Sequence, residues 1–519
     1  MRKLLVVSFF VLTFCLIAVG QQSNAITQKY FSDPDIRFNT PTLSIDEDRF
    51  ATYAEVMEWI SRNIEGRPGA EVRIIGESAN GLAIPVIYLQ RPGTDPKLKV
   101  WFQGVLHGNE PSGAEGLLYL ATRLLNDPET SAMLDHLSVA ILPIANVDGY
   151  VAMDRRSAKG FDLNRDQTKF ADPVSRIIKK AFIEWDPDIA YDMHEFQPTR
   201  KEYVGLGEKG ASISYDVKFL PSGFLNVPEE LRRANVDIFE SEAEKALDRF
   251  GYTHNFYFTA EVSGDEMVII KGAQSPHSSS TSYALSNAIS MLVETRGIGL
   301  GRTSFTRRTH SVFLVAESCL KSAVAHREEI REILNRARAE TVARKADIVV
   351  MAEAADKYFD IRFIDLQTSD IIIKKLRVKD ALDMKPLLVR SRPVGYILEA
   401  GAGREAEILR LLGLKLEPVK SNQKYRVESY TVSEYKEDDT VWEGIRRVKV
   451  STVLSFGKRR FQEGSWYVDL AQKNANYAVS LLEPESANGF VSYRVTETGP
   501  GQELKIHRVM KQIKKNNIN

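Results

Sequence analysis

Short apolar runs alternate with amphipathic stretches between about residue 45 and residue 345. The apolar runs have the length of buried strands and lie at 99–106, 137–144, 188–193 and 288–293. Helical spacing of apolar positions is found at 111–125, 229–250 and 321–345. Strands that alternate with helices predict an α/β fold, here a mixed, mostly parallel sheet flanked by helices.

The pattern changes after residue 345. Short segments rich in β-branched and aromatic residues, separated by turn residues, favour strands at 424–432, 448–455, 464–470 and 489–496, with one helix at 404–412. A chain of 519 residues is longer than one hydrophobic core usually serves. We therefore expect a larger domain at 26–345 and a smaller, β-rich accessory domain at 346–519.

The first 20 residues have the composition of a secretory signal. Arg2 and Lys3 precede an apolar run at 4–19, and small residues follow, so cleavage is expected after Gly20 or after Ala25. An uncleaved membrane anchor is the alternative, but the apolar run is short for a spanning helix. The prediction is an exported protein, periplasmic or extracellular, without stable membrane association after cleavage.

Charge and cysteine content narrow the possible partners. Lys plus Arg and Asp plus Glu are both 69, so the formal net charge is zero and no basic excess favours nucleic acid as a partner.

Of the two cysteines, Cys15 lies in the signal, which leaves Cys319 without an internal disulfide partner. Its helical setting is typical of a small buried residue, and we assign it no catalytic role.

Two of the eight histidines directly follow apolar strands. They are His107 and His194, and Glu110 stands three residues after His107 at the entry to a helix. Because sites in open α/β sheets form beyond the carboxyl ends of strands, we expect these side chains at one edge. Two histidines and a carboxylate suit one catalytic zinc ion per chain, with a fourth position open for water. Taken singly, each residue is equally typical of a structural position, and the other six histidines lack such a setting.

A third fragment, residues 161–165, adds groups that suit such a site. Asn164 and Arg165 could bind a carboxylate, because arginine offers a planar fork of donors. Asp162 could accept a hydrogen bond from the non-ligating nitrogen of His107 and so set its tautomer. Taken alone, the fragment would favour a surface turn in which Asp162 and Arg165 pair.

Taken in their order along the chain, these fragments resemble the motifs of the zinc carboxypeptidase family, which includes carboxypeptidase A. The resemblance covers roughly residues 45 to 320. Each motif is degenerate, and it is their ordered occurrence that is specific. The matching elements are His107-Gly-Asn-Glu110, Asn146-Val-Asp-Gly149, Arg155-Arg156, Asp162-Leu-Asn-Arg165, His194 after a strand, and Leu292-Val-Glu-Thr295.

The resemblance implies roles for individual residues. Glu294 would be the general base that takes a proton from a zinc-activated water and passes it to the leaving amine. Arg155 would stabilise the oxyanion, with Arg156 as the open alternative. Asn164 and Arg165 would bind the terminal carboxylate, so the implied partner is a peptide with a free C-terminus.

The sequence also departs from the family pattern. Val147 replaces a proline usually found between Asn146 and Asp148. A substrate-capping tyrosine has no clear counterpart; Tyr283 is the nearest candidate for this substrate-binding role and Tyr257 the weaker one. His277 lies in a loop expected near the cleft, and an ordinary loop histidine is the favoured interpretation.

We therefore expect a zinc metallocarboxypeptidase that hydrolyses C-terminal peptide bonds. One alternative is a zinc-dependent deacylase of N-acyl amino acids, similar to aspartoacylase and succinylglutamate desuccinylase. The 146–149 motif, the setting of Glu294 and the export signal favour the peptidase. A second alternative is a catalytically inactive peptide-binding relative, because fold resemblance alone does not prove turnover. The β-rich region resembles an accessory domain of some bacterial members.

Overall fold

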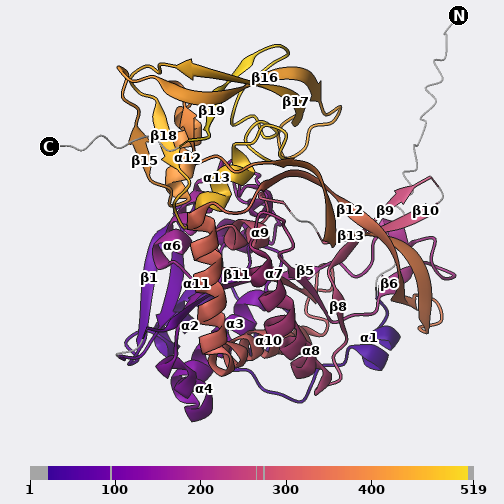
Figure 1. The fold of residues 1–519 in the computed structure, drawn as a ribbon. Helices are drawn as coiled ribbons and strands as arrows, with labels where there is room; N and C mark the ends of the chain where they lie inside the picture. Colours follow the sequence, from indigo (N-terminus) through magenta and orange to yellow (C-terminus); the bar gives the residue numbers. More distant parts are fainter. Residues whose placement is uncertain (1–21, 94–95, 265, 273–274, 512–519) are drawn as a thin grey trace, which may run out of the picture.

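The computed structural model describes residues 22–93, 96–264, 266–272 and 275–511. It has a large α/β body with a β-rich region at one end (Figure 1). The signal expected at 1–20 lies outside the described residues. Among the residues that are described, no helix has the length and apolar character needed to cross a membrane.

The body is built on a mixed eight-stranded sheet with the order β1-β2-β4-β3-β5-β11-β7-β8. The central strands β4, β3, β5 and β11 run parallel. On one side β1 and β2 pair antiparallel with their neighbours, and on the other side β7 pairs antiparallel with β11 and parallel with β8. The predicted mixed α/β sheet is therefore confirmed. The strands are β1 (Ala70–Glu77), β2 (Ala83–Leu89), β3 (Leu98–Gly104), β4 (Leu137–Leu142), β5 (Ile189–Phe196), β7 (Val217–Pro221), β8 (His254–Phe256) and β11 (Ile289–Arg296).

Both faces of this sheet are covered, which explains why its central strands are continuously apolar. Neighbouring residues of a strand point to opposite faces. Trp101 packs against Phe182 of α6 on one face, and Tyr191 packs against Phe239 on the other. The helices of the body are α1 (Asn24–Tyr30), α2 (Tyr53–Asn63), α3 (Ser112–Asn126), α4 (Pro128–Ala132), α5 (Val147–Ala152), α6 (Pro173–Trp185), α7 (Glu229–Ala234), α8 (Ser241–Asp248), α9 (Ser279–Ala284), α10 (Phe305–Ala325) and α11 (Arg327–Ala343).

Two of the predicted helices are interrupted. The stretch expected at 229–250 comprises α7, a π-helical segment at Asn235–Glu240, and α8. The helix expected at 321–345 begins within α10 and continues as α11 after a break at His326, whose backbone leaves the helical region.

A second sheet joins strands from both sides of residue 345. Its order is β6-β12-β13-β10-β9, with β6 (Ala211–Ile213), β9 (Phe258–Ser263), β10 (Glu266–Lys271), β12 (Ile348–Asp365) and β13 (Ile371–Arg390). The long hairpin β12–β13 pairs with β6 through β12 and with β10 through β13. Strand pairing thus crosses the expected boundary, and the division of the chain at residue 345 stays a prediction.

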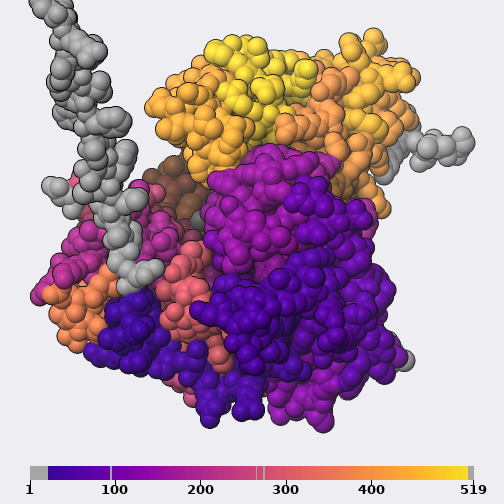
Figure 2. Space-filling model, turned by 180° about the vertical axis from the view of Figure 1, so that it is seen from behind, coloured from indigo at the N-terminus to yellow at the C-terminus, as the bar shows by residue number. Residues whose placement is uncertain are grey.

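The C-terminal region contains a third sheet, which lies over one end of the body (Figure 2). Its order is β15-β18-β14-β19-β16-β17. Strands expected at 424–432, 448–455 and 464–470 are present as β16, β17 and β18, and the helix expected at 404–412 is α12. The elements are β14 (Gly395–Leu398), α12 (Gly403–Leu411), β15 (Leu416–Pro418), β16 (Tyr425–Glu437), β17 (Val448–Arg459), β18 (Trp466–Asp469), α13 (Ala475–Leu481) and β19 (Glu503–Val509).

The prediction of a strand at 489–496 is wrong. The segment is a series of turns, and its backbone N–H groups bond locally, as from Tyr493 to the carbonyl of Gly489 and from Val495 to that of Phe490. Phe490 and Tyr493 are nevertheless buried. The apolar composition therefore reflects packing of a folded loop and not strand pairing.

Candidate active site

His107 and Glu110 lie where β3 turns into α3. The backbone at Gly108 runs directly against the segment at Gly149 and Tyr150, where an added Cβ would meet the Gly149 carbonyl carbon at 1.9 Å. Only glycine fits this approach. The first two motifs of the sequence therefore pack against each other, which holds the turn that carries His107.

His194 on β5 completes a cluster with these two residues. Ligand atoms of His107, Glu110 and His194 all lie within 4.8 Å of one another, and all three residues are buried. The Nδ1 atoms of the two histidines are 3.0 Å apart, and the Glu110 carboxylate lies 2.7 Å from His107 Nδ1 and 2.9 Å from His194 Nδ1. Two imidazole nitrogens and a carboxylate directed to one point fit the donor set of a catalytic zinc site.

The outward nitrogen of each histidine has a carboxylate partner. His107 Nε2 lies 3.2 Å from Asp162 Oδ1, and His194 Nε2 lies 2.9 Å from Asp192 Oδ2. Such partners leave Nδ1 of both rings free for a metal. Sequence reasoning anticipated Asp162 but missed Asp192, although its position two residues before His194 on one strand puts both on the same face.

The carboxylates of the cluster are held ionised. Burial works against ionisation of Asp162, but the neighbouring His107 and Arg155 keep its pKa well below the ordinary value. In Glu110 burial also opposes ionisation, and His107 and His194 again keep the pKa low. A buried pair of carboxylates in this state creates the negative site that a cation requires.

Glu294 on β11 stands in register with His194 of β5 and with Lys218 of β7. Residues opposite each other on paired strands share a face of the sheet, so the three side chains form a row. Glu294 is buried, and its Oε2 has no hydrogen-bond partner among the described residues. Burial and the Glu110 charge raise its pKa, while the charges of His194 and Lys218 act in the opposite direction.

The two neighbouring arginines point to different places. Arg155 Nε donates to Asp162 Oδ2 at 3.0 Å, and its Nη1 lies 3.1 Å from His107 Nδ1. Arg156 forms an ion pair with Glu443 of the C-terminal region at 2.9 Å. Arg155 is therefore the one of the two that faces the ligand cluster.

Asn164 and Arg165 lie in a short 3-10 turn, Leu163–Arg165. The Asn164 side-chain oxygen accepts a hydrogen bond from the backbone N–H of Ser279 at 2.8 Å, and Arg165 Nη1 donates to the Asn164 carbonyl at 2.8 Å. Both side chains line a cleft of about 400 Å³. The same cleft is lined by His107, Arg155, Arg200, Lys218, Tyr257 and Glu294.

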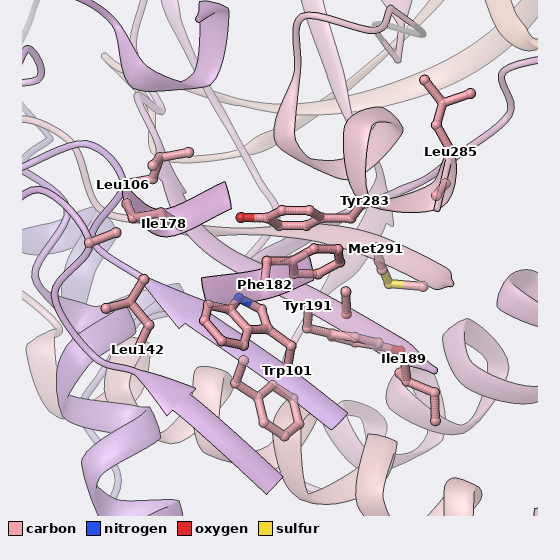
Figure 3. Packing of buried hydrophobic residues seen from close by; sticks show 14 of the residues in the cluster. Trp101, Leu106, Leu142, Ile178, Phe182, Ile189, Tyr191, Tyr283, Leu285 and Met291 are labelled. Atoms are coloured by element: carbon pink, nitrogen blue, oxygen red, sulfur yellow. The ribbon is translucent and has the colours of Figure 1, made fainter. Parts of the chain in front are cut away.

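The structure corrects the expectation for Tyr283. This residue is 1% exposed, stacks on Phe182 at 4.1 Å between ring centroids, and donates a hydrogen bond to Gln103 Oε1 at 2.7 Å (Figure 3). It belongs to the core and cannot reach a substrate in the cleft. The weaker candidate, Tyr257, lines the cleft. His277 is buried beside Ser275 and Tyr493 and takes no part in the cleft lining.

The chain is similar in sequence to known zinc carboxypeptidases. Residues 57–286 match the family described as zinc carboxypeptidase. The chain is 30% identical over 444 residues to Carboxypeptidase 2 of Trichophyton rubrum. The matched region covers 83% of this chain and 81% of that protein. Carboxypeptidase 2 of Trichophyton equinum is 29% identical over 445 residues, with the same coverage. A crystal structure of a metallo-carboxypeptidase from Burkholderia cenocepacia is 19% identical, covers 52% of this chain and 69% of that chain, and has a TM-score of 0.41.

Proposed function

The chain belongs to the zinc carboxypeptidase family, and from that premise we propose that it removes residues from peptides with a free C-terminus, with Glu294 as the general base. One observation carries this proposal. The unpartnered carboxylate oxygen of Glu294 lies in the row that begins at His194, on the cleft side of the ligand cluster. A base beside the metal ligands is what hydrolysis by water requires.

His107, Glu110 and His194 would hold one zinc ion. When bound there, zinc lowers the pKa of water and polarises a carbonyl. Asp162 and Asp192 fix the tautomers of the two histidine ligands from behind. The cluster thus leaves one side, the cleft side, open to substrate.

Glu294 takes the proton of the attacking water and returns it to the leaving amine. Burial raises the pKa of this carboxyl, so it holds the proton long enough to deliver it. Arg155, fixed by Asp162, is placed to stabilise negative charge on the carbonyl oxygen of the scissile bond.

Asn164 and Arg165 would bind the terminal carboxylate of the substrate. Because only a chain end offers this group, the pair makes the enzyme an exopeptidase. Tyr257, which lines the cleft, would cover the bound residue. The N-terminal segment supports export to the periplasm or the extracellular space. No specific observation supports the deacylase or the inactive relative.

The proposal is tested by one peptide library with free and amidated C-termini, analysed by mass spectrometry together with zinc content. We expect about one zinc per chain and trimming of free C-termini only. Arg165→Ala should weaken kcat/KM for free C-termini by roughly 10- to 100-fold through the lost ion pair. Trimming of amidated peptides at equal rate, or no trimming with zinc present, contradicts the proposal.

A further inference from the structure

A buried lysine lies in the cleft, and the mechanism above does not use it. Lys218 belongs to β7, is 2% exposed and stands opposite Glu294 in the strand register. It lines the cleft with Arg165, Tyr257 and Glu294. Its position at the end of the row that starts at His194 puts it on the same face of the sheet as Glu294.

The ammonium group of Lys218 is incompletely paired. Nζ donates one hydrogen bond, to the Phe258 carbonyl at 3.1 Å. It also lies 4.0 Å from the ring centroid of Phe196 and 4.9 Å from those of Tyr257 and Phe258. A lysine ammonium carries three donors. Among the described residues no carboxylate forms an ion pair with it, Glu294 included.

Two arginines near the cleft, half-buried Arg155 and buried Arg308, have carboxylate partners. Arg155 is paired with Asp162 at 2.8 Å, and Arg308 with Glu195 at 3.3 Å. A buried charge without a partner is costly, so its partner is expected to arrive with the ligand. Burial lowers the pKa of Lys218 to about 7, and an entering carboxylate would favour its charged form.

We propose that Lys218 binds the side-chain carboxylate of the substrate's C-terminal residue, which makes aspartate and glutamate the preferred residues for removal. This inference rests on the proposed function. Arg165 would take the terminal carboxylate and Lys218 the side-chain carboxylate, so one acidic residue matches both cations. Leu220 and Phe258, which also line the cleft, offer apolar contact to the methylene groups between the two charges.

The test compares two peptides that differ only in a C-terminal Glu or a C-terminal Gln. Glutamine has nearly the same shape but no charge. For the wild-type enzyme we expect kcat/KM to favour Glu by roughly 10- to 100-fold, the range of a charged hydrogen bond. Lys218→Met should bring this ratio to about one, because it slows the Glu peptide far more than the Gln peptide.

Lys179 offers a matched control. It is also fully buried and lies over Phe182, Tyr283 and Tyr477, but its Nζ bonds to Ser282 and it does not line the cleft. Lys179→Met should leave the Glu-to-Gln ratio unchanged. If Lys218→Met fails to fold, Lys218→Gln replaces it, and the wild-type ratio is measured in either case.

Three outcomes overturn the inference. A wild-type ratio near one, with both peptides trimmed, leaves the carboxypeptidase function intact and removes the acidic preference. If Lys218→Met lowers kcat/KM equally for both peptides, Lys218 acts through Glu294 and not on the substrate side chain. Failure to trim any free C-terminus removes the proposed function and this inference with it.

Discussion

Three side chains on adjacent strands form one row across the main sheet: His194, Glu294 and Lys218. Each has a different environment. His194 is enclosed by Asp192 and Glu110. Among the residues that the structure describes, Glu294 Oε2 has no hydrogen-bond partner and Lys218 Nζ has one carbonyl acceptor. The register therefore places the proposed metal ligand His194, the proposed base Glu294 and the cation Lys218 side by side.

Substitution of the base separates catalysis from metal binding. Glu294→Gln should lower kcat by roughly 100- to 10,000-fold, because the amide cannot accept the proton of the attacking water. Zinc content should stay unchanged, since Glu294 is not among the three clustered ligands. Both quantities are measured on the same preparation, with Glu353→Gln, an exposed residue of β12, as control. A variant of near wild-type rate would remove Glu294 as the base.

At the scale of elements, α10 contributes a buried histidine to the packing around α8. His310 Nδ1 lies 2.9 Å from the Tyr252 hydroxyl, and the ring meets Phe250 edge-on and Phe313 face-on. Burial and the nearby Arg307 lower the pKa of His310 to about 4. The folded protein therefore keeps this histidine neutral over a range in which an unfolded chain would protonate it.

This difference predicts an acid sensitivity of α10. The unfolded chain takes up the proton near pH 6.5 and the folded protein only near pH 4, so the stabilising contribution is complete above pH 6.5 and is lost as the pH falls toward 4. Between pH 6.5 and pH 4, the free energy of unfolding should fall less in His310→Gln than in the wild type, by up to about 3 kcal/mol. Denaturant unfolding at several pH values measures it.

The control for this measurement is Ser311→Ala, because it removes a hydroxyl that does not titrate in this range from the same helix. It should reproduce the wild-type pH dependence. An identical pH dependence in wild type and His310→Gln would show that the buried histidine does not contribute.

For the whole molecule, the C-terminal region contacts two segments beside the cleft, the loop at 275–279 and the segment at 154–170. Asn488 donates to Ser275 Oγ at 2.8 Å, and the Tyr493 hydroxyl lies 3.1 Å from His277 Nδ1. The same loop, 275–279, holds Asn164 through the N–H of Ser279. The 154–170 segment is bound by the Arg156–Glu443 ion pair. The C-terminal region therefore contacts, from outside the main sheet, the segments that hold the site residues in place.

This contact predicts an effect of the C-terminal region on substrate binding. Tyr493→Phe removes the hydroxyl that meets His277 and should raise KM several-fold with a smaller change in kcat, because the loop that positions Asn164 loosens. Peptide kinetics measures both constants. Tyr467→Phe loses a hydroxyl within the C-terminal region, away from the cleft, and should leave KM unchanged. An unchanged KM in Tyr493→Phe would show that the loop holds its position without this contact.

The sequence by itself determined the α/β order of the body and the residues of the ligand cluster. Both depend on local information: apolar runs of strand length, and metal-binding residue types at strand ends. His107, Glu110 and His194 lie together because parallel strands deliver their carboxyl ends to one edge of the sheet. The choice between Arg155 and Arg156 stayed open in the sequence, since adjacent residues of one loop share the same local signal.

Only the tertiary structure decided what each remaining side chain meets. The sequence favoured Tyr283 over Tyr257 as the substrate-binding tyrosine, yet Tyr283 packs on Phe182 and Tyr257 lines the cleft. Lys218 looks like an ordinary strand lysine until its register with Glu294 is known. The hairpin β12–β13 pairs with strands more than 70 residues away, between Val268 and Arg377 and between Phe363 and Ile213. Burial and pairing of this kind arise from contacts between distant segments, and no local pattern encodes them.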